Sequence, residues 1–568
     1  MVDSDELKPL LLADGTNGVY CEEQLESKLQ TSDWRGRPIA IRNGKLGGKR
    51  SIIFTTGSIC LWYTGFFGIL YNLVFFFGDV FNEGSGLAAN DTNNWVGSMF
   101  LASLLGAFVS ESSLGRLWTC TLFQGIATMG MILMVISIYM VLSVETVPST
   151  SKSFFFVSIY LLSIGTGAAQ PTLQSLGADQ FDTEKDKATF FTWYLILCNV
   201  GMVLAVTLVV YIVSAKGWLI GFGMVAVIGS AGFFLFVSGI PLYRQYKHRG
   251  NPYQRALQVL VAAARKWRIK SPSSSEDLYE VQDALGSKYS IKHTVGLRWL
   301  DKAAIVIPCA DNDNGARNVW KLSTVTEVEE VKAVLRLIPI WATSILYSTL
   351  YTQSSTLLIE QGAVMDLTVA GDFVMEPATM NLFNLLIVVF IAPVYNAIIV
   401  PLARSITGLP QGLSSLQRCG IGYLVSAVGM ILAGALETYR LHCFKQGLPL
   451  ISIFWQTPVY LIIGFAQFLA GIGMMEFFYT YSPLPLRSLG MSLAATCTAL
   501  GTYVSTILVS IVTVVTTRDG ATGWIPKDLN DGHLDYFFWL LGGIALVNLC
   551  LFTGCSTVFM RHQSSCRR

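Results

Sequence analysis

Long apolar stretches, each near the length of a membrane-spanning helix, most constrain how this chain can fold. A helix needs about 20 apolar residues to cross the hydrocarbon of a bilayer, and in lipid it must pair its own backbone N–H and C=O groups. By that criterion the sequence contains about twelve spans. They lie near 51–78, 93–110, 117–144, 153–173, 189–214, 218–242, 333–358, 379–403, 416–436, 453–482, 488–516 and 535–560. The sequence therefore predicts an all-α membrane protein.

The composition agrees with a membrane location. The chain is 52% hydrophobic and 13% charged, whereas soluble domains carry about 25% charged residues. A formal net charge of +2 gives no indication of nucleic-acid binding. The 11 cysteines are scattered, without a C-x-x-C pair or a Cys/His cluster of metal-ligand spacing. No metal and no cofactor are predicted.

A polar and basic interval divides the spans into two sets of six. We expect a leader over 1–50, a first half over 51–242, a linker over 243–332, a second half over 333–560 and a short tail over 561–568. The leader, the linker and the tail are rich in Lys and Arg, and basic loops stay cytosolic. Both termini are therefore predicted to be cytosolic. Two six-helix halves joined by a cytosolic linker is the plan of the major facilitator superfamily.

The linker stretch Pro252–Lys270 has apolar residues at helical spacing together with many cations. Two interpretations fit it equally well. It lies along the inner membrane surface, or it is an ordinary helix that packs against the base of the protein.

A motif after the second span contains an acid followed by Gly-Arg. Within Gly106–Arg116, the side chains of Glu111 and Arg116 are expected to pair at the cytosolic interface and to take part in conformational gating. The motif resembles the inter-helix signature of the major facilitator superfamily. The alternative is a plain surface ion pair, worth less than about 1 kcal/mol.

Four further motifs point to one family. They are Gly177–Asp182, Phe190–Tyr194, Thr326–Lys332 and Leu529–Leu540. As a set they resemble the plant nitrate transporter 1/peptide transporter family, a branch of the proton-dependent oligopeptide transporters, over about residues 30 to 560. The resemblance implies a major facilitator fold that carries nitrate, small peptides, hormones or specialised metabolites, usually driven by protons. The detailed pattern is similar to the family's seventh subgroup.

The departures from the family pattern concern its charged residues. The E-x-x-E-R/K motif of the first helix is replaced by Ile59, Trp62 and Tyr63, and the fourth-helix lysine by Gln170. A seventh-helix histidine of one family member is replaced by Tyr351. We therefore expect altered proton coupling, as antiport, facilitated diffusion or less stringent symport. An anion would have to be held by neutral donors and helix dipoles.

Glu476 is the candidate for proton or cation coupling. It lies in the run 451–483, which holds no other acid or base except tyrosines. A charge at membrane depth costs at least about 2.5 kcal/mol, so such a residue normally faces a polar cavity, binds a cation or takes up a proton. The resemblance assigns the family's tenth-helix glutamate to this position. The alternative is a carboxylate near the cytosolic end that reaches water or Arg487.

Five residues are candidates for solute binding. Tyr351 and Gln353 form a polar patch in the seventh span. The alternative is that they make interhelical hydrogen bonds, as small polar residues commonly do in membrane helix bundles. Gln170 precedes Pro171, which is expected to interrupt the fourth helix or merely to kink it. Asn199 and Trp193 in the fifth span are further candidates for the cavity or for packing.

These features together predict a secondary transporter of a small polar solute. Nitrate is the first candidate, followed by a dipeptide, a hormone or potassium. A solute sensor that binds without efficient transport is the alternative, whereas the chain lacks an H-E-x-x-H or G-x-S-x-G enzyme motif with its partners and a repeated pore loop. The expected location is the plasma membrane. An acidic dileucine pattern over Glu6–Leu11 offers the vacuolar membrane instead.

Overall fold

The computed structural model describes residues 31–35, 46–112, 114–143, 148–181, 184–246, 252–269, 278–280, 293–294, 296–306, 312–313, 316–370, 373–408, 412–483, 486–518 and 522–567. Most of the predicted leader lies outside these residues. The sorting pattern Glu6–Leu11 lies outside them entirely.

The first half is a bundle of helices that follow one another with short connections. Its elements are α2 (Lys49–Phe81), α3 (Ser85–Ser112), α4 (Gly115–Leu142), α5 (Ser149–Ala178), α6 (Glu184–Leu204), the π-helical turn η2 (Ala205–Val209), α7 (Val210–Lys216), α8 (Trp218–Ser238) and η3 (Ile240–Leu242). Helices α6, η2 and α7 run on without a gap and correspond to one predicted span.

The second half has the same character, with two interrupted spans. Its elements are α11 (Ile338–Thr352), η6 (Gln353–Ser355), α12 (Leu357–Ala363), the hairpin of β5 (Thr368–Ala370) and β6 (Phe373–Val374), η7 (Pro377–Met380), α13 (Asn381–Val394), η8 (Tyr395–Ile399), α14 (Val400–Thr407), α15 (Ser415–Lys445), η9 (Ile453–Gln456), α16 (Thr457–Tyr481), α17 (Arg487–Thr516), η12 (Leu529–Asp531) and α18 (Leu534–Arg567). The seventh predicted span is thus broken by a 3₁₀ turn at Gln353–Ser355.

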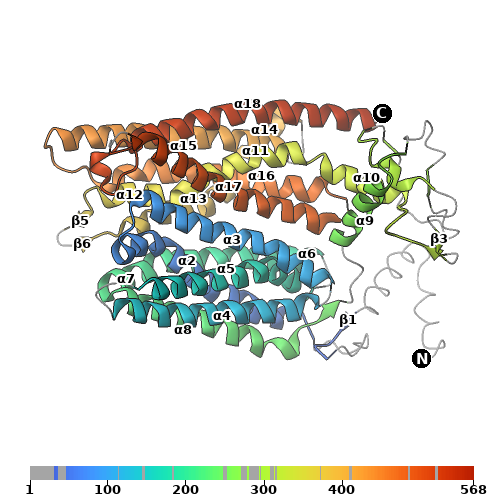
Figure 1. Cartoon of the computed structure of the whole chain (residues 1–568), viewed down its shortest axis with the longest axis horizontal. Coiled ribbons are helices and arrows are strands. Elements are labelled where there is room, and N and C mark those ends of the chain that lie inside the picture. The colour runs from blue at the N-terminus through green and yellow to red at the C-terminus, as the bar shows by residue number, and fades with distance from the viewer. Residues whose placement is uncertain are drawn as a thin grey trace.

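The linker adds short elements at one end of the molecule. They are β2 (Gln245–Tyr246), which pairs with β1 (Thr31–Ser32), α9 (Pro252–Arg265), η5 (Asp301–Ala304), the hairpin of β3 (Asn312–Asp313) and β4 (Ala316–Arg317), and α10 (Val325–Leu335). Figure 1 shows α9, α10 and β3 at the end where α18 terminates. We call this the linker end and the opposite end, with α7, α12 and the β5–β6 hairpin, the distal end.

The two halves lie side by side with their helices roughly parallel to one long axis (Figure 1). Helices α3 and α17 meet where the halves face each other, whereas α8 and α18 lie on opposite outer sides. We call the contact between α3 and α17 the seam. Its residues decide how the halves are held together.

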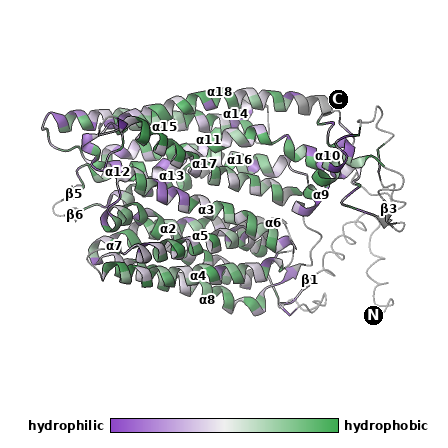
Figure 2. Cartoon of the chain, viewed as in Figure 1, coloured by the Kyte–Doolittle hydropathy of each residue, from purple (hydrophilic) through white to green (hydrophobic). Residues whose placement is uncertain are grey.

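Eleven helical segments of the described residues are long and apolar enough to cross a membrane. The remaining predicted span, 379–403, falls on the consecutive elements α13, η8 and α14. Hydrophobic residues dominate the long helices in Figure 2, and hydrophilic residues gather around α9, α10 and β3. The chain is an all-helical, multi-pass integral membrane protein.

Helix α3 begins earlier than the sequence indicates. Its predicted span starts at 93, but the helix starts at Ser85 and includes the polar stretch up to Asn94. The amide of Asn90 donates to the Ser510 hydroxyl of α17 (3.0 Å). Polar side chains of α3 therefore find partners in the other half, which hydropathy along one segment cannot reveal.

Glycines let α3 and α5 pack backbone to backbone. A Cβ atom on Gly106 would lie 2.0 Å from the Ala168 carbonyl oxygen, and one on Gly167 would lie 1.8 Å from the Met99 carbonyl oxygen. Small residues of this kind permit close helix contacts in membranes. The contact fixes α5, and with it Gln170, against α3.

The apolar face of the linker helix α9 packs against protein. Val259, Ala262 and Ala263 are buried in one cluster with Val328 and Val331 of α10. This packing supports the interpretation of α9 as an ordinary helix at the base of the protein.

Candidate solute-binding and gating sites

Gln170 and Tyr63 form a neutral hydrogen-bonded pair inside the first half. The Gln170 Nε2 atom on α5 donates to the Tyr63 hydroxyl on α2 (2.6 Å), and both side chains are partly exposed. The predicted interruption of the fourth helix is wrong, because α5 runs unbroken from Ser149 to Ala178 with Pro171 inside it. An amide and a phenol thus meet where the family pattern places charged residues.

The other two departures in α2 are packed into apolar surroundings. Ile59 is 1% exposed and Trp62 is 3% exposed, and each belongs to a hydrophobic cluster. Only Tyr63 of the three carries a polar group that reaches α5. Hydrophobic side chains of the core therefore occupy two of the positions at which the family pattern has the charged motif.

Tyr351 provides the corresponding polar group of the second half. It lies at the end of α11, is partly exposed, and has the side chain of Asn384 from α13 next to its hydroxyl. Tyr71 of α2 lies close enough to interact electrostatically with it. Tyr351 thus lies near α2 of the first half. We call the Tyr63–Gln170 pair and the Tyr351–Asn384 pair, one in each half, together the central polar cluster.

Gln467 is a polar residue that the sequence reasoning did not single out. Its Oε1 atom on α16 accepts a hydrogen bond from the Tyr347 hydroxyl of α11 (3.0 Å). It lies in the run 451–483, where Glu476 is distinguished by its charge and a neutral amide is not. The contact ties α16 to the helix that carries Tyr351.

Gln353 lies in the seam. It is fully buried, and its Nε2 atom donates to the Thr349 carbonyl (3.1 Å) and to the Ser505 hydroxyl of α17 (2.8 Å). Asn93 of α3 donates to the same Ser505 oxygen (3.2 Å). Gln353 thus holds the Ser505 hydroxyl that α3 contacts from the other half, and it would reach a solute only if the seam opened.

Asn199 and Trp193 both lie on α6. The Trp193 side chain is 52% exposed, whereas Asn199 is partly buried and takes part in interactions of its own. The next residue, Tyr194, packs into the cluster around Ile59 and Phe190. The structure thus does not join Trp193 to the central polar cluster.

Glu476 has an arginine partner that the sequence did not indicate. Arg418, near the start of α15, places its Nη1 atom 2.5 Å from the Glu476 Oε2 atom, and the side chains are 13% and 33% exposed. The Arg418 guanidinium also lies 5.2 Å from the centre of the Tyr395 ring. An adjacent cation stabilises an ionised carboxylate. Glu476 is therefore one member of an ion pair within the second half.

Glu111 and Arg116 are paired as the sequence predicts, with an additional acid. The Arg116 guanidinium lies 3.2 Å from Glu111 and 2.6 Å from Asp179 at the end of α5. Asp179 belongs to the motif Gly177–Asp182, so two motifs that are far apart in the sequence meet at the linker end. The arrangement ties α3, α4 and α5 together.

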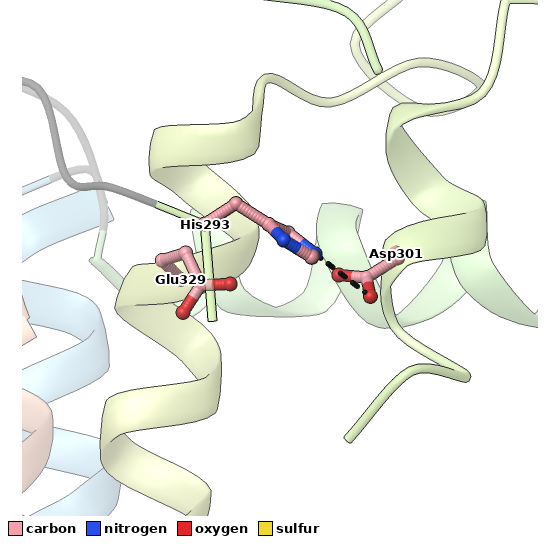
Figure 3. Close-up of side chains that lie close together, drawn as sticks. All are labelled: His293, Asp301 and Glu329. Carbon is pink, nitrogen blue, oxygen red and sulfur yellow. Dashed lines mark ion pairs between the residues drawn. The ribbon is translucent and has the colours of Figure 1, made fainter. Parts of the chain in front are cut away.

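Three potential metal ligands lie close together in the linker region. They are His293, Asp301 and Glu329 (Figure 3). The Lys332 Nζ atom lies 2.6 Å from Asp301 and 2.7 Å from Glu329, and the Lys332 side chain is fully buried. One ammonium group thus pairs with both carboxylates. The cluster fastens the linker to α10.

The seam is closed at the distal end and open at the linker end. Beyond the contacts of Asn90 and Asn93, Ser85 of α3 donates to Glu360 of α12 (3.0 Å). Toward the linker end, a cavity of about 580 Å³ separates α3 from α17. A second cavity of about 580 Å³ lies at the distal surface next to Glu360 and Lys527.

Comparison with known proteins places these features in context. The sequence profile of the PTR2 family, described as the POT family, matches residues 117–525. Protein NRT1/PTR FAMILY 8.3 of Arabidopsis thaliana is 37% identical over 573 residues, which cover 96% of this chain and 97% of the relative. Protein NRT1/PTR FAMILY 7.3 of the same plant is 37% identical over 572 residues, covering 94% and 92%.

A solved structure shows a similar fold. A crystal structure described as an auto-inhibited POT family peptide transporter has a TM-score of 0.68 at 20% identity, covering 89% of this chain and 97% of that one. At this level of identity the similarity concerns the fold. Relatives of the seventh subgroup, which the sequence suggested, are matched at 37% identity, and relatives of the eighth at 36–39%.

Proposed function

This chain belongs to the POT family and is a membrane transporter, and we propose that it moves a small polar solute, with nitrate as the first candidate, between its two halves. The observation that carries the proposal is the neutral pair of Gln170 and Tyr63 in the first half, and we propose that Tyr351 of the second half contacts the same solute. Amide and hydroxyl groups donate hydrogen bonds without a fixed charge. They suit a small solute that must be released again.

Nitrate fits this cluster because its oxygens accept hydrogen bonds from the Gln170 amide and the Tyr351 hydroxyl. A dipeptide, a hormone or potassium are the further candidates. A second set of contacts to the solute is proposed for Asn199, Trp193 and Gln353. Gln353 can take part only after the seam has opened. The proposed location is the plasma membrane, with the vacuolar membrane as the alternative.

The proposed coupling differs from a scheme with acids in both halves. Among the three replaced positions of α2, none is acidic, and the two that are buried lie in apolar clusters. Glu476 remains the proposed coupling residue, acting through its ion pair with Arg418. Proton or cation binding at Glu476 would release Arg418 and loosen α15 from α16. One such site supports at most one proton per cycle.

Uptake and efflux in oocytes test the function directly. Nitrate, potassium, dipeptides and hormones are offered separately at two pH values, and saturable nitrate flux with weak pH dependence is expected. Gln170→Ala should reduce the flux, while Lys445→Ala on the exposed end of α15 should not. Saturable binding without flux would favour a solute sensor. Strict inward symport with more than one proton would contradict the proposed coupling.

A further inference from the structure

The cavity at the linker end of the seam has a lining that is almost entirely hydrocarbon. On α3 it is lined by Leu101, Leu104, Leu105 and Phe108, which are spaced so that they share one helix face. Leucines of α17 line the opposite wall. The cavity thus lies between apolar residues of α3 and α17.

The few polar groups of the lining are already used within the protein. The hydroxyls of Tyr253 and Ser492 are hydrogen-bonded to each other. The Trp341 Nε1 atom donates to the Leu493 carbonyl (3.0 Å) and to Thr496 (3.1 Å), whose hydroxyl donates to the same carbonyl (2.8 Å). Burial raises the pKa of the Tyr253 phenol above its ordinary value, so this group stays uncharged. A polar solute would gain little here.

The α3 wall of the cavity is exposed at the protein surface. Leu101, Leu105 and Phe108 are 38%, 46% and 46% exposed on a helix that crosses the membrane. Along α17 the lining runs from Leu489 to Leu500, which is about 16 Å at 1.5 Å per residue. That length matches one leaflet of a hydrocarbon core of about 30 Å.

We propose that this cavity binds one acyl chain of a bilayer phospholipid, which enters sideways between α3 and α17. The apolar lining excludes a charged occupant. Because the polar groups of the lining are bonded to each other, the acyl chain is held by dispersion contacts and apolar burial only. The Tyr253 ring, which lies 6.3 Å from the Phe108 ring, closes the cavity toward the linker.

This site would favour the conformation described here. The cavity exists because α3 and α17 separate at the linker end while the distal contacts hold, and a ligand stabilises the state that it binds. Closing the linker end would require the acyl chain to leave. The lipid is thus proposed to bias the transporter toward the state that is open on the linker side.

Photocrosslinking in lipid nanodiscs tests the site. The full-length protein is reconstituted with a phosphatidylcholine that carries a diazirine in one acyl chain, and the labelled peptides are quantified by mass spectrometry. Labelling of 101–108 and 489–500 is expected to exceed that of the outer faces of α4 and α18 severalfold. Leu105→Trp should fill the cavity and lower the labelling of 489–500 severalfold.

The matched control is Leu122→Trp on α4, because Leu122 is 48% exposed and lies outside the cavity. It should leave the labelling of 489–500 unchanged. If Leu105→Trp fails to fold, as judged by gel filtration, Leu101→Trp takes its place. Equal labelling of all lipid-facing helices, or unchanged labelling of 489–500 in the filled variant, would overturn the proposal.

Discussion

The Gln170 amide and the Tyr63 hydroxyl are joined by a hydrogen bond of 2.6 Å, so α5 and α2 meet through neutral groups. Both residues stand where the family pattern has charges. The two replacements are therefore coupled in space, although they are 107 residues apart. The effect of a substitution at one of these positions should therefore depend on the residue at the other.

Replacing the neutral pair by a charged pair should change both stability and coupling. Gln170→Lys alone places an unpaired cation at membrane depth, which should cost at least about 2.5 kcal/mol. Adding Tyr63→Glu should recover part of that loss, because the two side chains are in contact. Thermal unfolding in detergent measures the effect. Flux at two pH values should become more pH-dependent in the double variant, and equal losses for the single and double variants would contradict the pairing.

Breaking the ion pair of Arg418 and Glu476 should destabilise the second half. Either Arg418→Gln or Glu476→Gln leaves one charged partner without its counter-ion, which should cost about 1–3 kcal/mol. Because Glu476 is 33% exposed, the lower end of that range is expected. The double variant should lose less than the sum of the two. If Glu476→Gln leaves the transport rate and its pH dependence unaltered, the proposed coupling role is wrong.

The seam should be sensitive to the smallest possible addition. A Cβ atom on Gly97 of α3 would lie 2.5 Å from the Thr502 Oγ1 atom and 2.9 Å from the Tyr503 ring. Gly97→Ala should therefore push α3 away from α17 and weaken closure of the distal end. Labelling of a cysteine introduced at Asn94 should speed up. Gly543→Ala on α18, where no heavy atom lies within 4 Å of the added Cβ, is the matched control and should change nothing.

The three charges at the linker end should differ in importance for gating. Arg116→Gln removes both ion pairs at once and should reduce flux most. Asp179→Asn should reduce flux more than Glu111→Gln, because Asp179 is 2.6 Å from the guanidinium and Glu111 is 3.2 Å away. Initial rates of solute flux, normalised to protein at the cell surface, give the order. A larger loss of flux in Glu111→Gln than in Asp179→Asn would contradict this prediction.

The sequence predicted the positions of helices more reliably than it predicted which side chains form ion pairs. The span expected at 416–436 was found as α15, and the pair of Glu111 and Arg116 was foreseen because its members are close along the chain. Arg418 was missed as the partner of Glu476, since 58 residues separate them. Asp179 belongs to the motif Gly177–Asp182, but the sequence does not connect it to Arg116.

Burial of charge shows the same limit. Glu437 and Arg440 of α15 are buried together, with side chains only 0% and 1% exposed, and Arg440 reaches Asn530 of the motif Leu529–Leu540 (2.6 Å). Hydropathy alone gives no reason to bury these charges. The tertiary structure allows it because each charged group finds its partner inside.

The sequence by itself determined that this chain crosses the membrane many times as helices, because a backbone in lipid must satisfy its hydrogen bonds within each segment. It also determined which charges of the family are absent. Only the tertiary structure decided that Gln170 faces Tyr63, that Gln353 lies in the seam and that Glu476 faces Arg418. Side-chain pairing depends on how helices are arranged in three dimensions, and apolar periodicity within a helix carries no information about its neighbour.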